Sequence, residues 1–71
     1  MNETEINLAN RYRGFYTKIA LKSIYGIYDS HNGTNNSASC WCSSTDRKNK
    51  SHQFYEWFDA KLLENDDKAE N

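Results

Sequence analysis

The density of aromatic residues constrains what this chain can fold into. Two Trp, five Tyr and three Phe occur among only 71 residues, and each side chain can bury about 150–250 Å². That is more aromatic surface than a two-helix core can hide. A chain this short forms one small domain, here 1–71, and such domains often gain stability from a metal, a disulfide or a partner subunit. We therefore expect an aromatic-rich core, with surplus aromatic side chains at an interface, and a homodimer would provide one.

The first part of the chain carries apolar residues three and four positions apart, which is the pattern of one wide helical face. This spacing predicts an amphipathic helix over about 4–28. Asn2 or Thr4 suits the N-cap position. Gly14 weakens the predicted helix by about 1 kcal/mol relative to Ala.

A second amphipathic helix is predicted over about 51–66, with Ser51 as its N-cap and an apolar face that includes Phe54, Tyr55, Trp57, Phe58 and Leu62. The intervening residues 29–50 are rich in Asn, Ser and Gly, which favour turns, and Trp41 is the candidate anchor of this loop. The sequence thus predicts a mainly α fold of two amphipathic helices joined by a long polar loop. Residues 67–71 are polar and acidic and are expected to fray.

A second apolar stripe crosses the end of the first predicted helix and consists of Leu21, Tyr25 and Tyr28. A helix that is apolar nearly all round is buried or has a partner. The alternative is an α+β fold with a short β-hairpin at about 24–29 and 38–43, because Ile and Tyr suit strands. Asn32-Gly33 is a hairpin turn signal, but it equally suits a helix C-terminus with a left-handed glycine. The sequence does not decide between the continuous helix and the β-hairpin.

One local motif resembles a known family. Gly26-Ile27-Tyr28, followed later by Ser43-Ser44 and Arg47, resembles the opening of the GIY-YIG nucleases. In that family the two motifs lie on adjacent strands and an arginine follows. The second motif would fall on Trp41-Cys42-Ser43, where its tyrosine, isoleucine and glycine are absent. The resemblance supports the hairpin alternative and assigns no catalytic residue, so we expect a protein that is not an enzyme.

Charge is distributed unevenly along the chain, although the net charge is only −1. Residues 11–50 carry seven basic and two acidic side chains, whereas 51–71 carry two basic and six acidic ones. Basic side chains interleaved with aromatic ones are typical of phosphate contacts and base stacking. The sequence therefore suggests, as an alternative function, a nucleic-acid- or ribosome-associated binder that uses Arg11, Arg13, Lys18, Lys22, Arg47, Lys48 and Lys50. The pI of about 6.0 is low for a dedicated nucleic-acid domain.

Aromatic side chains also dominate the energetics of protein interfaces. We therefore expect a small non-enzymatic protein that binds and modulates or inhibits a larger protein partner, as accessory proteins of phages and other mobile elements do. The candidate contacts are exposed aromatics and an acidic helix, namely Tyr25, Tyr28, Trp41, Tyr55, Trp57, Glu56 and Asp59. No apolar run approaches the roughly 20 residues of a membrane span, and the acidic start is unlike a secretory signal. A cytoplasmic location is the corresponding expectation.

Two cysteines and two histidines form the candidate metal set, His31, Cys40, Cys42 and His52. Two sulfur and two nitrogen ligands suit tetrahedral zinc, and zinc would tie the long loop to both helices. The spacing of the two cysteines differs from the usual Cys-x2–4-Cys arrangement. We therefore expect a chain without a cofactor, with zinc at these four residues as the alternative.

Overall fold

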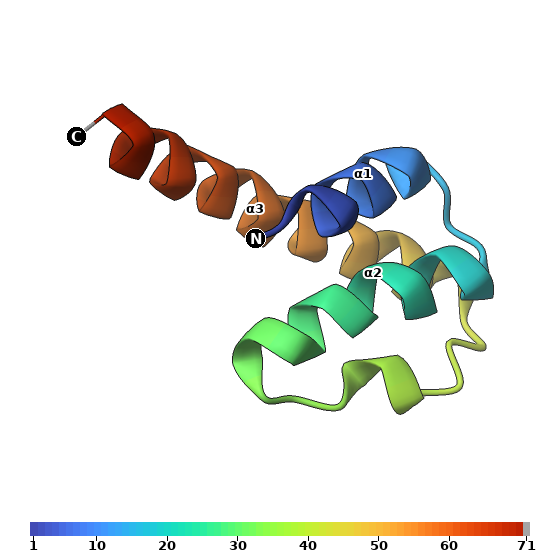
Figure 1. The fold of residues 1–71 in the computed structure, drawn as a ribbon. Helices are drawn as coiled ribbons and strands as arrows, with labels where there is room; N and C mark the ends of the chain where they lie inside the picture. The colour runs from blue at the N-terminus through green and yellow to red at the C-terminus, as the bar shows by residue number, and fades with distance from the viewer. Residues whose placement is uncertain (71) are drawn as a thin grey trace.

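The computed structural model describes the backbone of residues 1–70 and the side chains of residues 1–64. The chain is mainly helical, as predicted, and the described residues contain no strand. Three α-helices and one short 3-10 helix follow one another, α1 (Glu3–Tyr12), α2 (Lys18–Asn32), η1 (Asn36–Ala38) and α3 (Ser44–Glu70). α2 packs against both α1 and α3, and Figure 1 shows α3 continuing beyond the other two α-helices as a single helix.

The helix predicted over 4–28 is two helices, and this corrects the sequence interpretation. α1 begins with a capping box, in which the Glu5 amide donates to Asn2 Oδ1 at 2.8 Å and the Asn2 amide donates to Glu5 Oε1 at 3.2 Å. α1 ends at Tyr12, two residues before Gly14, whose φ of +85° is incompatible with a right-handed helix. The low helix propensity of glycine alone predicts only a weakened helix at Gly14, whereas the left-handed conformation of Gly14 separates two helices.

α2 excludes the hairpin alternative. Thr17 caps its start by accepting a hydrogen bond from the Ala20 amide at 3.1 Å, and Gly33 ends it in the left-handed conformation at φ +66°. The segment 24–29 therefore lies inside a helix, and 38–43 contains no strand. Of the two interpretations of Asn32-Gly33, a hairpin turn or a helix C-terminus, the structure shows the helix C-terminus.

α3 begins seven residues before the predicted N-cap. Ser43 caps it, because its Oγ accepts a hydrogen bond from the Asp46 amide at 3.2 Å. Ser51 instead lies within the helix and is 1% exposed. The connection between α2 and α3 is correspondingly shorter than predicted and contains η1. At the other end, α3 runs to Glu70, through most of the segment expected to fray, and residue 71 lies outside the described part.

The core is built from aromatic and aliphatic side chains of all three α-helices. Its members are Ala9, Ala20, Leu21, Ile24, Tyr25, Ile27, Trp41, Phe54, Tyr55 and Phe58. Phe54 and Phe58 are fully buried and stack with their ring centroids 5.8 Å apart. Trp41 anchors the loop as predicted, since its ring packs 5.1 Å from that of Tyr25. α2 is therefore covered on two sides, which explains why its sequence is apolar nearly all round.

Two charged side chains fasten the connecting segments. The Asp29 carboxylate accepts hydrogen bonds from Thr34 Oγ1 at 2.7 Å and from the Asn36 and Ser37 amides at 2.9 and 2.8 Å. Partial burial opposes ionisation of Asp29, but these donors outweigh it and hold its pKa well below the usual range. Arg47 of α3 donates to the carbonyl oxygens of Tyr16 at 2.6 Å and Trp41 at 2.7 Å. One arginine thus fixes both inter-helix connections.

None of the described helices combines the length and the apolar character that crossing a bilayer demands.

Candidate functional site: a partly exposed aromatic surface

Three of the five aromatic residues expected at an interface are core residues instead. Tyr25, Trp41 and Tyr55 are 4%, 3% and 7% exposed. The hydroxyl of Tyr25 donates to the Lys50 carbonyl at 2.8 Å, and that of Tyr55 donates to the Ala9 carbonyl at 2.6 Å. The prediction that these three side chains are exposed is therefore wrong. The two tyrosine hydroxyls thus find partners between helices, whereas the buried Trp41 Nε1 has no hydrogen-bond partner among the described residues.

Tyr28 and Trp57 remain partly exposed and lie against each other. Their ring centroids are 5.0 Å apart in an edge-to-face arrangement, and the His31 ring lies 5.8 Å from that of Trp57. We call these three residues the Tyr28–Trp57 surface. Its inner side rests on the core, because Tyr28 contacts Tyr25 and Trp57 contacts Phe54 with centroids 5.5 and 5.6 Å apart. The two rings are thus held in place by packing before any partner arrives.

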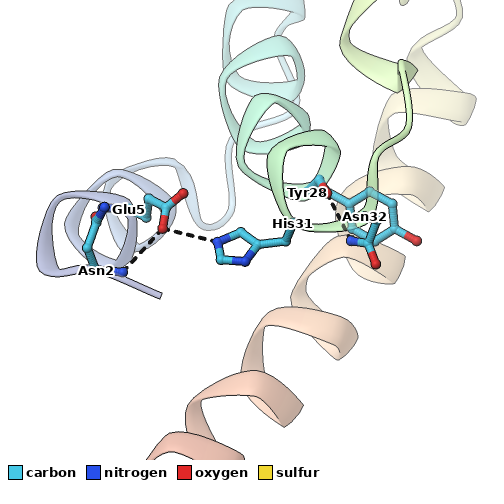
Figure 2. A network of polar contacts seen from close by, with 5 residues as sticks. All are labelled: Asn2, Glu5, Tyr28, His31 and Asn32. Carbon is cyan, nitrogen blue, oxygen red and sulfur yellow. Dashed lines mark hydrogen bonds and ion pairs between the residues drawn. The ribbon is translucent and has the colours of Figure 1, made fainter.

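The first turn of α1 borders this surface. Figure 2 shows His31 reaching from the end of α2 toward Glu5 of α1, with His31 Nε2 3.1 Å from Glu5 Oε1. The same carboxylate oxygen accepts the amide of Asn2. Partial burial alone would raise the pKa of Glu5, but the hydrogen bonds from His31 and Asn2 lower it. Glu5 therefore presents a carboxylate beside the aromatic surface.

The two acidic candidates on α3 differ in their surroundings. Asp59 Oδ1 pairs with Arg13 Nη2 at 2.7 Å, with both side chains about half exposed. Asp59 therefore serves to hold α1 to α3. Glu56 is exposed and precedes Trp57 in the chain. Of the two, Glu56 is the exposed acidic residue that is not part of the pair with Arg13.

Two of the seven basic candidates contact other parts of the fold. The Arg13 guanidinium lies 4.4 Å above the Tyr55 ring, and Arg47 is committed to two backbone carbonyls. The other five are distributed over all three α-helices and are Arg11 on α1, Lys18 and Lys22 on α2, and Lys48 and Lys50 on α3. The sequence places these residues in one segment, whereas the fold distributes them among separate elements.

The four predicted zinc ligands are not brought together. His31 pairs with Glu5 near the C-terminal end of α2, whereas His52 lies 3.4 Å from the hydroxyl of Tyr16, just before the N-terminus of α2. A 15-residue helix separates these ends by roughly 20 Å. Within the part of the chain that the structure describes, no three His, Cys, Asp or Glu side chains cluster in a way that would hold a metal ion. The predicted four-ligand zinc site is therefore wrong.

Sequence reasoning missed the polar side chains that fasten the surface and the connecting segments. The sequence does not single out Glu5, because nothing in it pairs this residue with a histidine 26 positions away. The sequence places Asp29 in the predicted loop and makes Arg47 a candidate for nucleic-acid contact, so it indicates neither residue's role in fastening the connections. In each case the partner is a group that only tertiary folding brings close, so no local pattern indicates it.

Comparisons of the chain with models of protein families, with curated proteins and with solved structures found no match.

Proposed function

We propose that this chain is a small non-enzymatic protein that binds and modulates a larger protein partner through the Tyr28–Trp57 surface. One observation carries the proposal: two large aromatic rings stay partly exposed and packed together, while Tyr25, Trp41 and Tyr55 are buried. Interface energy concentrates in aromatic anchors, and anchors held rigid before binding lose less conformational freedom on association.

The charges beside the surface favour a partner segment that carries a basic residue next to an apolar one. Glu5 presents a carboxylate at one edge, and Glu56 is exposed next to Trp57 in the chain. Such charges mainly add steering and specificity to an interface. An inhibitor or regulator encoded by a phage or other mobile element, acting in the cytoplasm, is the setting that we propose for this activity.

Site-specific photocrosslinking in the cells that make the protein tests the proposal. Tyr28 is replaced by the photoreactive p-benzoylphenylalanine, and the same probe at Ile19, which is 70% exposed on α2, serves as the matched control. We expect a discrete protein adduct from position 28 and none from position 19. Glu56→Arg should weaken the adduct without unfolding the chain, because exposed substitutions usually change stability by less than about 0.5 kcal/mol.

The same experiment separates the other candidate partners. An adduct with the mass of two chains would replace the proposal with a homodimer. A product removed by nuclease, with binding that falls steeply with salt, would instead favour the basic side chains and a nucleic acid. Equal adducts from positions 19 and 28 would show that the aromatic surface is not selective, and the proposal would be wrong.

A further inference from the structure

Two large apolar side chains are exposed at the connection between α1 and α2. Phe15 is 57% exposed, and Ile19, in the first turn of α2, is 70% exposed. The other exposed large apolar side chain among the described residues, Leu63, lies in the distal part of α3. Single exposed apolar residues are ordinary on a protein surface, but two at one short connection form a small patch. We call Phe15 and Ile19 the apolar tip.

The backbone at the apolar tip is fixed, so the exposure of Phe15 is part of the fold. The Phe15 amide donates to the Tyr12 carbonyl at 3.0 Å. The neighbouring Tyr16 carbonyl accepts a hydrogen bond from Arg47 Nε at 2.6 Å, and Thr17 caps α2. The backbone is thus held on both sides while the Phe15 side chain stays outside the core. Anchors that are rigid before binding lose less conformational freedom on association.

Positive charge accompanies the apolar tip. Residues 6–28 contain no acidic side chain and four basic ones, namely Arg11, Arg13, Lys18 and Lys22. Arg13 is paired with Asp59, whereas the other three basic side chains are exposed. Lys18 begins α2 directly before Ile19, and Lys22 follows one turn later on the same side of the helix.

The two ends of the molecule carry opposite charge. Figure 1 shows the α1–α2 connection at one end and the C-terminal part of α3 at the other. The start of α3, residues 44–50, is fastened to this connection by Arg47 and carries three basic residues against one acidic one. Residues 59–70 carry five acidic residues against two basic ones. An anionic surface therefore attracts the end with the apolar tip and repels the other end, which orients the chain.

A bilayer with anionic lipids matches the apolar tip in both charge and polarity. Basic side chains beside large apolar ones are typical of protein segments that lie in the membrane interface, where anionic headgroups attract each Lys or Arg. A nucleic acid would account for the basic side chains, but it offers the exposed Ile19 no apolar environment. The bilayer is therefore the surface that accounts for both kinds of residue.

We propose that the apolar tip inserts into the interface of an anionic lipid bilayer, with Lys18 and Lys22 at the headgroups. This attachment is peripheral and requires no spanning helix. Positions 19 and 28 are about two and a half helical turns apart and therefore lie on opposite sides of α2. The Tyr28–Trp57 surface thus stays accessible to a protein partner on a membrane-bound chain, and neither proposal depends on the other.

Sedimentation with lipid vesicles tests the proposal on the full chain. Vesicles of phosphatidylcholine with about 30% phosphatidylglycerol are compared with vesicles of phosphatidylcholine alone. We expect binding to the anionic vesicles only, and a marked loss at about 1 M salt, where the screening length falls to about 3 Å. Lys18→Gln and Lys22→Gln should each weaken binding about fivefold. Ile19→Ser should weaken it at least about tenfold, because it removes apolar area that the bilayer buries.

Two substitutions in the distal part of α3 are the matched controls. Leu63 is 66% exposed, close to the value for Ile19, and Lys61 is about half exposed. Leu63→Ser and Lys61→Gln should leave vesicle binding unchanged, and circular dichroism should show every variant folded, because all these positions lie at the surface. On irradiation with anionic vesicles, p-benzoylphenylalanine at position 19 should form a lipid adduct, and the same probe at position 63 should form none.

Four results would overturn the proposal. The first is the absence of binding to anionic vesicles, or equal binding to neutral ones. The second is unchanged binding of Ile19→Ser, which would leave only charge and favour another polyanion such as a nucleic acid. The third is an equal loss in Leu63→Ser and Ile19→Ser, which would show that the apolar tip is not selective. The fourth is a protein adduct from position 19, which would place a protein at the tip.

Discussion

Replacing Tyr55 by Phe removes the buried hydrogen bond that joins α1 to α3. The Tyr55 hydroxyl donates to the Ala9 carbonyl at 2.6 Å, and both residues are buried. Ala9 is one of the last four residues of α1, whose carbonyls have no partner within the helix. Tyr55→Phe therefore leaves a buried carbonyl without the donor that the fold provides.

The expected loss in the free energy of unfolding is about 2 kcal/mol, since an unsatisfied buried acceptor costs roughly 1–3 kcal/mol. For a domain of this size, that loss lowers Tm by roughly 10 °C. Tyr25→Phe should cost only about 0.5–1 kcal/mol. Its acceptor, the Lys50 carbonyl, lies early enough in α3 to keep a helical partner as well.

Urea denaturation followed by circular dichroism measures these differences. Tyr28→Phe is the matched control, because the structure gives its hydroxyl no hydrogen bond, and it should change the free energy of unfolding by less than about 0.5 kcal/mol. The reasoning would be refuted if Tyr55→Phe were no more destabilising than Tyr28→Phe, or if Tyr25→Phe were clearly the most destabilising of the three.

The pH dependence gives a second measure of Tyr55. Burial raises its pKa to about 12, above the value near 10 of an unfolded tyrosine. The fold therefore favours the neutral phenol, and this contribution to stability is complete below pH 10 and declines as the pH rises from about 10 to 12. Tyr55→Phe should show a shallower alkaline loss of stability than the unaltered chain.

Three further predictions concern backbone and loop residues. Gly26 lies in α2 with open space around it, so Gly26→Ala should stabilise the fold by about 0.5–1 kcal/mol, whereas Gly14→Ala at φ +85° should destabilise it by about 1 kcal/mol; both are measured by urea denaturation. Asp29→Asn should lower the free energy of unfolding at neutral pH. The difference in free energy of unfolding between this variant and the unaltered chain should narrow as the pH falls from about 5 toward 2, because the lowered pKa of Asp29 contributes stability only while its carboxylate is ionised. Arg47→Gln should cost about 2–3 kcal/mol through the loss of charge-assisted bonds to two carbonyls, and a loss below 0.5 kcal/mol in thermal unfolding would contradict the role assigned to it.

The sequence predicts helices well where the apolar periodicity is strong, but it misplaces their ends. The periodic pattern continues through Gly14 because α1 and α2 face the same core, so no break in spacing marks the turn between them. The start of α3 was missed for the opposite reason. Its first turns are polar and depend on tertiary contacts of Arg47 and on the burial of Ser51, neither of which leaves a local pattern.

The sequence indicates that the candidate interface is aromatic, but it does not indicate which aromatic residues are exposed. Tyr25 and Tyr28 share one stripe in the sequence, yet the connecting loop covers Tyr25 with Trp41 and leaves Tyr28 partly exposed. Which side of α2 that loop covers depends on the long-range contacts of Arg47 and Trp41. The aromatic residues could therefore be identified as important before the structure, whereas their division between core and surface could not.

The way in which α1 is attached has a consequence for how the protein opens. α1 has ten residues, fewer than the roughly 12–15 that a helix needs to persist alone in water. It is held by the pairs Glu5–His31 and Arg13–Asp59, by the hydrogen bond from Tyr55 to the Ala9 carbonyl and by the burial of Ala9 in the core. Because α1 depends on these tertiary contacts, their loss melts α1 and exposes the Tyr55 ring in a single cooperative event. In native-state hydrogen exchange, α1 should behave as one unit that opens at a lower free energy than α2.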